Sequence, residues 1–144
     1  MSDEKWIFTA DDARQAQRER NMLKELWNSS TGLLYRFGLT PNVGNAQNKL
    51  QQEWDELQVA IDTHTHAGWA DDEDELVKEI RDEGVDVIVT LLNLLNAYGV
   101  TWDEVESGVK QTIDKNDRKN HNTHEVHTWA DGTKTIERIG RYGA

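Results

Sequence analysis

The stretch that decides the fold is EGVDVIVTLLNLL, residues 83–95. Polar residues interrupt this run, so it is too short and too polar to cross a membrane. Its second half is nevertheless apolar on nearly every side, which predicts the central helix of a helical protein. The stretch also carries two carboxylates, Glu83 and Asp86, whose three-residue spacing puts them on the same side of a helix.

The sequence on either side of this stretch predicts more helices. An N-cap at Thr9 begins a helix that runs to about residue 37, and an apolar stripe with helical spacing marks a second helix over 43–63. The central helix should span 72–98. A capping box at residues 101–104 begins a fourth helix that ends near Lys119. The turn-forming sequence at 130–133 then predicts a β-hairpin over 125–139.

Together these elements predict an all-α fold, an antiparallel bundle of about four helices with a small C-terminal β-hairpin. The chain has 144 residues, the usual size of one domain. We therefore expect a single domain over 1–144, with a core at about 9–120 and the hairpin tail at about 121–144.

Composition excludes several classes of protein. The net charge of −11 argues against a nucleic-acid partner, and the absence of cysteine excludes disulfides, zinc–thiolate sites and a thiol nucleophile. Residues 1–6 are acidic and polar and show no secretory signal, and no apolar run is long enough to cross a membrane. We expect a cytoplasmic protein.

A second pair of carboxylates, Glu53 and Glu56, lies on the helix that precedes the central one. Two adjacent helices could aim all four carboxylates at one point, where like charges repel unless protons or cations neutralise them. Mg²⁺ and Mn²⁺ prefer oxygen ligands, so the pattern predicts a metal site. Glu79 and Asp82 extend the same acidic surface as candidate additional ligands.

The order Glu53-x-x-Glu56, a gap of 26 residues, then Glu83-x-x-Asp86 resembles the ExxE…ExxD signature of the all-α nucleoside triphosphate pyrophosphohydrolases of the MazG type. The helix–turn–helix over 94–105 and the basic, Asn-containing segment at 114–119 are also similar to that family. The tail, with WADG at 129–132, looks like the tail of phage- and prophage-type members. The resemblance covers 45–139; the tail lacks the expected proline, and the first helix is not diagnostic.

The resemblance implies hydrolysis of a (deoxy)nucleoside triphosphate to the monophosphate and pyrophosphate, with purine substrates such as dGTP or dATP. That activity would control a nucleotide pool in a bacterium or a phage-infected host cell. It also implies a homodimer or a homotetramer built as a dimer of dimers. The implied cofactor is Mg²⁺, with Mn²⁺ as a substitute, held by Glu53, Glu56, Glu83 and Asp86.

Within this chemistry, one carboxylate, Glu53 or Glu56, would act as general base. Lys115 and Arg118 could contact the phosphates, with Asn116 or Asn93 donating hydrogen bonds. For any one of these residues, an ordinary place on a solvated helix surface is the competing interpretation.

Three alternatives remain open at this stage. Phosphoribosyl-ATP pyrophosphohydrolases share the helical scaffold and the acidic pairs. A carboxylate-bridged di-iron bundle would require Glu-x-x-His pairs, but Glu56 and Asp86 occupy those positions here. The third alternative is a non-enzymatic acidic interaction module, which would tolerate neutral substitutions at all four carboxylates.

Overall fold

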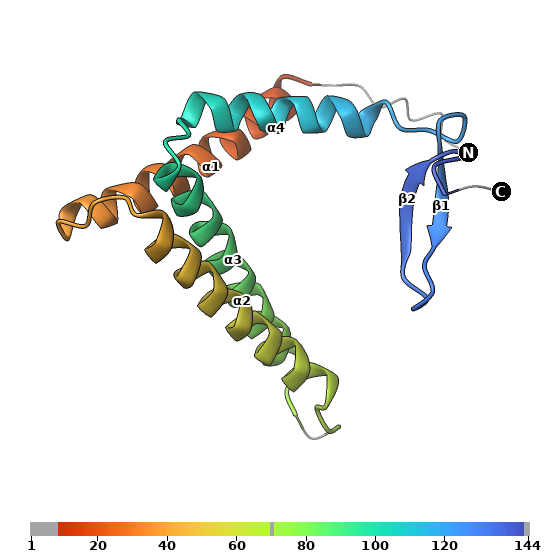
Figure 1. The fold of residues 1–144 in the computed structure, drawn as a ribbon, viewed down its shortest axis with the longest axis horizontal. Helices are drawn as coiled ribbons and strands as arrows, with labels where there is room; N and C mark the ends of the chain where they lie inside the picture. The colour runs from red at the N-terminus through yellow and green to blue at the C-terminus, as the bar shows by residue number, and fades with distance from the viewer. Residues whose placement is uncertain (1–8, 70, 143–144) are drawn as a thin grey trace. The chain divides into compact units, whose positions relative to one another are not determined.

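The computed structural model describes residues 9–69 and 71–142, and within these ranges the chain forms four helices and one two-stranded sheet (Figure 1). The elements in chain order are α1 (Ala10–Arg36), α2 (Val43–Thr65), α3 (Glu73–Ala97), α4 (Trp102–Asp117), β1 (His124–Thr128) and β2 (Lys134–Arg138). The predicted helical fold with a small C-terminal hairpin is confirmed. Residues 1–6, on which the prediction of no secretory signal rests, lie outside the described ranges. No helix among the described residues has the length and apolar character needed to cross a membrane.

Local capping interactions explain where the helices begin and end. The Thr9 hydroxyl accepts a hydrogen bond from the Asp12 backbone N–H at 3.1 Å, and Asp12 Oδ2 accepts one from the Thr9 N–H at 2.8 Å. This capping box satisfies N–H groups at the start of α1 that have no partner within the helix. The Asp72 side chain accepts hydrogen bonds from N–H groups at the start of α3, and Gly99, with φ of 81°, follows the end of that helix.

Backbone contacts divide the chain into two compact units, Met1–Trp102 and Asp103–Ala144. The first unit contains α1, α2 and α3, and the second contains nearly all of α4 and the hairpin. This division lies at the start of α4, whereas the sequence suggested a core that continues to about residue 120. The assignment of both units to one domain stays a prediction.

In the first unit, α2 and α3 form an antiparallel pair that lies side by side along most of their length (Figure 1). α3 contacts both α1 and α2, as expected of the central helix. The core is small. Among the described residues, the buried apolar side chains are Trp27, Ala60, Val87 and Leu92.

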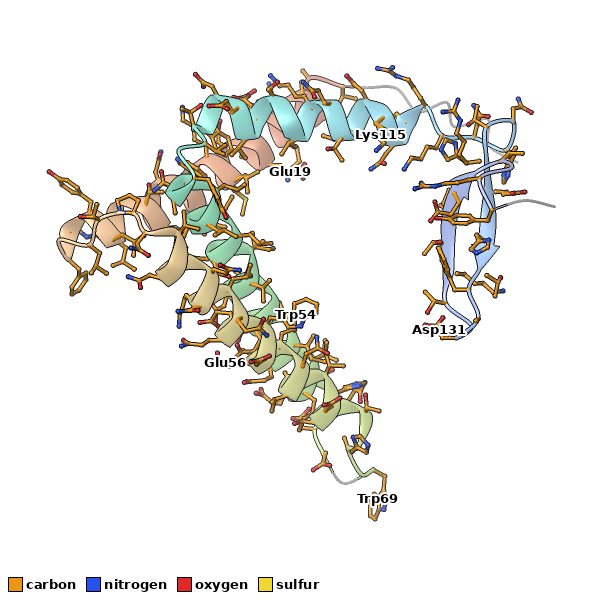
Figure 2. All side chains as sticks on the ribbon, viewed as in Figure 1. Glu19, Trp54, Glu56, Trp69, Lys115 and Asp131 are labelled. Carbon is orange, nitrogen blue, oxygen red and sulfur yellow. The ribbon has the colours of Figure 1, made fainter. Side chains whose placement is uncertain are left out.

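The apolar second half of α3 is only partly buried. Val87 is buried, but Leu91 is 43% exposed and Leu95 is also exposed. Trp54, which belongs to the apolar stripe of α2, is 49% exposed, and Figure 2 labels it on that helix. Periodicity identifies the apolar side of a helix but does not supply a partner to cover it. Trp27 does find a partner, since its ring centroid lies 6.2 Å from that of Trp102.

The second unit ends in the predicted hairpin. The strands are antiparallel, with Val126 opposite Ile136. The backbone N–H of Trp129 donates a hydrogen bond to the Thr133 carbonyl at 2.7 Å. Gly132 occupies the turn with φ of 88°, a conformation that favours glycine. The ring of His127 lies 4.5 Å from those of both Trp129 and Tyr142, so a small aromatic cluster covers part of the sheet.

Candidate metal centre

The antiparallel pairing of α2 and α3 brings three of the four predicted carboxylates together. Glu53 and Glu56 from α2 and Glu83 from α3 each offer one oxygen, and these three oxygens lie within 4.8 Å of one another. Figure 2 labels Glu56 on the α2 part of this pair. Three carboxylate oxygens at this spacing are the kind of donor set that Mg²⁺ or Mn²⁺ uses. We call these three residues the carboxylate triad.

Two oxygens of the carboxylate triad are buried without a hydrogen-bond partner. Glu53 is only 7% exposed and Glu83 is half-buried, and Oε2 of each makes no hydrogen bond. Carboxylate oxygens accept hydrogen bonds but cannot donate them, so only a donor or a cation can satisfy these two atoms. Leaving such atoms unpaired is unfavourable, and a bound divalent cation would remove that penalty. The residues present therefore fit a hard metal ion.

The electrostatic environments of Glu53 and Glu83 differ. Lys49 Nζ lies 2.7 Å from Glu53 Oε1, and this hydrogen bond lowers the pKa of Glu53. Desolvation raises the pKa of Glu83, and the negative charges of Glu56 and Asp86 raise it further. Glu53 is thus held ionised by a cation, whereas the charge on Glu83 is opposed by its surroundings.

Asp86, the fourth predicted ligand, does not belong to the carboxylate triad. Its side chain is exposed, although it lies within the apolar stretch of α3. It lies with Glu53 on a cavity of about 480 Å³, and its charge contributes to the raised pKa of Glu83. Asp86 is therefore near enough to act on the triad electrostatically.

Glu79 and Asp82, the two candidate additional metal ligands on α3, have different surroundings. Glu79 lies with Glu56 and Glu83 on a second cavity of about 620 Å³, whose other lining residues include Asp55 and Glu75. Asp82 instead pairs with its neighbour Arg81, with an N–O distance of 2.9 Å. The carboxylate triad thus contributes to two cavities, with Glu53 on one and Glu56 and Glu83 on the other.

The predicted phosphate-binding residues fall in both units. Asn93 lies on α3 in the first unit, and its buried Oδ1 has no hydrogen-bond partner. Lys115 and Asn116 lie on the last turn of α4 in the second unit, and Arg118 follows that helix. Lys115 and Arg118 line a pocket of about 560 Å³ within the second unit, together with His124 and Arg138 from the hairpin.

Lys49 is the residue of this site that the sequence analysis missed. It lies four residues before Glu53 on α2, the spacing at which oppositely charged side chains meet on a helix surface. That spacing was the signal that could have identified it.

The histidines are not part of the triad. His64 pairs with Glu73 at 2.8 Å, and His127 packs against aromatic rings.

Comparison with protein-family models, with curated proteins and with solved structures finds no match for this chain. The resemblance to the MazG-type pyrophosphohydrolases therefore stays a prediction from the sequence.

Proposed function

We propose that this protein is a Mg²⁺-dependent nucleotide pyrophosphohydrolase that converts a (deoxy)nucleoside triphosphate to the monophosphate and pyrophosphate. One observation carries the proposal. The carboxylate triad brings three oxygens within 4.8 Å, and two oxygens of these side chains, Glu53 Oε2 and Glu83 Oε2, are buried without hydrogen-bond partners. The ExxE…ExxD resemblance supplies the reaction class, with purine dNTPs such as dGTP or dATP as the expected substrates.

In this proposal, Glu53, Glu56 and Glu83 hold the metal, and Asp86 adds negative charge at the edge of the site. A bound divalent cation neutralises phosphate oxygens and makes a coordinated water more acidic. Glu56 is the better candidate for general base, because its side chain is exposed and water can reach it. Glu53 is a poorer base, because its hydrogen bond to Lys49 lowers its pKa.

The phosphate contacts remain assigned from the sequence. Lys115, Asn116 and Arg118 are the candidates in the second unit. Lys115 and Arg118 form no ion pair with any carboxylate among the described residues. Both cations would therefore be available to an anionic group.

We also propose that two copies of the chain associate through one face of the α2–α3 pair. Trp54 on α2 and Ile88, Leu91 and Leu95 on α3 are all exposed. Leu50, Trp54, Val87 and Leu91 line a shallow depression on this pair. A second copy would cover these apolar groups with an identical surface, as symmetric dimers do. The homodimer would be the unit from which a homotetramer could form.

Product analysis tests the proposed reaction. The wild type, Glu53→Gln and Glu56→Gln are incubated with a panel of NTPs and dNTPs, with and without Mg²⁺. We expect monophosphate and pyrophosphate from the wild type only with metal, and a rate at least about 100-fold lower in each variant. Asp62→Asn is the matched control, because Asp62 is an exposed carboxylate on α2 outside the carboxylate triad.

The negative outcomes separate the alternatives. If no ordinary nucleotide is hydrolysed but Mg²⁺ still raises the melting temperature, the substrate is a different one, and phosphoribosyl-ATP is tested next. If Mg²⁺ neither stabilises the protein nor supports any turnover, the pyrophosphohydrolase proposal is wrong. The acidic interaction module then becomes the better interpretation.

A further inference from the structure

A cavity of about 480 Å³ extends from the carboxylates along the α2–α3 pair. On α3 it is lined by Asp86, Val89, Thr90, Asn93 and Ala97, whose spacing of three to four residues marks one side of the helix. The N-cap Asn42 and the α2 residues Ala46, Lys49 and Glu53 line the opposite side with the same kind of spacing. The cavity is therefore an elongated groove between two helix faces, and residues near the end of α1 close it.

The two ends of this groove differ chemically. Because α2 and α3 are antiparallel, Glu53 lies across from Asp86 at one end, and the start of α2 lies across from Asn93 and Ala97 at the other. Asn93 follows Asp86 by seven residues, a distance of about 10 Å along the helix. The carboxylate end is charged, whereas Leu33, Leu34 and Leu39 contribute apolar surface to the lining.

Two buried polar atoms of the lining residues lack a hydrogen-bond partner, Glu53 Oε2 at the carboxylate end and Asn93 Oδ1 farther along the groove. Asn93 Oδ1 is buried and accepts no hydrogen bond, whereas the buried hydroxyl of Thr90 donates to the Val87 carbonyl at 2.8 Å. Burying an amide oxygen without a hydrogen-bond donor is unfavourable. An unpaired group of this kind in a ligand-sized apolar cavity is the arrangement by which proteins orient and select a bound molecule.

We infer that this groove receives the base of the nucleotide and that Asn93 is the residue that hydrogen-bonds it. The inference rests on the proposed function and adds to it a specificity-determining residue. A nucleobase is flat, uncharged and heteroaromatic, so its faces suit the apolar side chains and its N–H groups suit Asn93 Oδ1. A purely aliphatic ligand would leave that oxygen unpaired, and a charged one would be poorly solvated among the leucines.

The geometry of an amide explains why Asn93 would select among bases. Its oxygen accepts a hydrogen bond while its adjacent NH₂ group donates one, so it can form two hydrogen bonds with a base edge that has the matching order of groups. The sugar and the first phosphates would lie along the groove between Asn93 and Asp86. That places the phosphate chain toward Glu53, the member of the carboxylate triad on this groove.

The first test measures binding without metal, phosphate or turnover. Saturation-transfer NMR is recorded on the full chain in EDTA with the four uncharged deoxynucleosides. We expect saturation at base protons of at least one nucleoside, and a binding constant about threefold to tenfold weaker in Asn93→Leu, as loss of one or two hydrogen bonds predicts. Asn96→Leu is the control, because Asn96 lies on the same helix but does not line the groove.

A stability measurement accompanies it. Because Asn93 Oδ1 has no partner to lose, Asn93→Leu should melt at or above the wild-type temperature. Should that variant fold poorly, Ala97→Leu reduces the space in the groove instead and should weaken nucleoside binding in the same way. Absence of saturation in the wild type, or unchanged saturation in a folded groove variant, overturns the inference.

The last test separates this inference from the proposed function. If the wild type hydrolyses dNTPs, Asn93→Leu should change the order of preference among the four bases, whereas Asn96→Leu should leave that order unchanged. Turnover with an unaltered order means that the reaction is correct and the base assignment is wrong. Nucleoside binding at the groove without turnover of any nucleotide means the reverse.

Discussion

The surroundings of Glu83 disfavour its ionised form in the metal-free protein. Desolvation is the largest cause of its raised pKa, followed by the charges of Glu56 and Asp86. Replacing Glu83 by the neutral Gln should therefore raise the melting temperature in EDTA at pH 7. It should also abolish the stabilisation by Mg²⁺, which in the wild type is about 2.7 kcal/mol at a concentration 100 times the Kd. Scanning calorimetry with and without Mg²⁺ measures both effects.

The raised pKa of Glu83 also predicts the pH dependence of that comparison. A carboxyl with a raised pKa in the folded state destabilises the fold when ionised, and protonation relieves this as the pH falls. The excess melting temperature of Glu83→Gln in EDTA should thus be largest near neutral pH and shrink as the pH falls through the raised pKa. Mg²⁺ binding by the wild type should weaken over the same range, because protons compete with the metal. A constant difference from pH 7 to pH 4 would contradict the assignment.

Lys49 favours the ionised form of Glu53, whereas the surroundings of Glu83 disfavour the ionised form of that residue. Its ammonium lies 2.7 Å from Glu53 Oε1 and lowers the pKa of that buried carboxylate. In Lys49→Met, Glu53 loses the one cation that pairs with it among the described residues, so the metal-free protein should melt at a lower temperature. Mg²⁺ should bind about tenfold more tightly, because a competing positive charge is gone. Isothermal titration calorimetry with Mg²⁺ gives the affinity. Lys78→Met is the control. Equal or weaker Mg²⁺ binding in Lys49→Met would show that Lys49 does not compete with the metal.

At the scale of the element, the helix boundaries could be predicted closely because they depend on local signals. Thr9, Asp72 and Gly99 act within a few residues of themselves, so their effects are readable without knowing the fold. The exposure of Trp54 and Leu91 could not be predicted, because burial depends on which neighbours arrive from elsewhere. A helical stripe reports only that one side is apolar.

The candidate metal site, like the helices, could be predicted only in part. Pairing α2 with α3 was enough to predict that Glu53, Glu56 and Glu83 meet. Asp86 was placed with them because a three-residue spacing was treated as a single direction. Three residues turn a helix by about 300°, so Glu83 and Asp86 point about 60° apart. Spacing alone does not decide which carboxylates meet, because Glu53 and Glu56 have the same spacing and both belong to the triad, whereas Asp86 lies with Glu53 on the groove.

One hydrogen bond in the turn of the β-hairpin is made by a side chain. Asp131 Oδ1 accepts a hydrogen bond from the Thr133 N–H at 2.9 Å, and this bond lowers the pKa of Asp131. A carboxyl with a lowered pKa stabilises the fold above its unfolded pKa, and that contribution is lost as the pH falls through the folded value. Asp131→Ala should therefore reduce the population of the hairpin at pH 7, and the difference from the wild type should disappear at strongly acidic pH.

NMR measures that population through the chemical shifts of Trp129 and Tyr142, whose ring centroids lie 5.0 Å apart. Asp131→Asn is the control, because it keeps an oxygen acceptor without a titrating group. It should retain more of the hairpin than Asp131→Ala and should show no acid transition of its own. An equal loss in both variants at pH 7 would mean that the charge, rather than the hydrogen bond, stabilises the turn.

At the scale of the whole molecule, the described residues bury few apolar side chains for a chain of this length. The core is small and consists of Trp27, Ala60, Val87 and Leu92. None of the described side chains is completely inaccessible to solvent. The same α2–α3 pair exposes Trp54, Ile88 and Leu91. Apolar area removed from water contributes about 25 cal/mol per Å², so covering this face would add substantially to stability. Association with a second copy is the proposed way to cover it.

Sedimentation equilibrium tests that association, with Leu91→Glu as the disrupting variant. The wild type should be dimeric or larger at micromolar concentration. Leu91→Glu should weaken the association by at least about 100-fold, because it places a charge in an apolar contact.

Each chain carries a net charge of −11, so raising the salt concentration should strengthen the association of the wild type by screening repulsion. Met22→Glu adds the same charge at an exposed position on α1 and should remain associated. A wild type that is monomeric at 100 µM in both low and high salt would rule out self-association through this face, and the apolar side chains of α2 and α3 would then require a different partner.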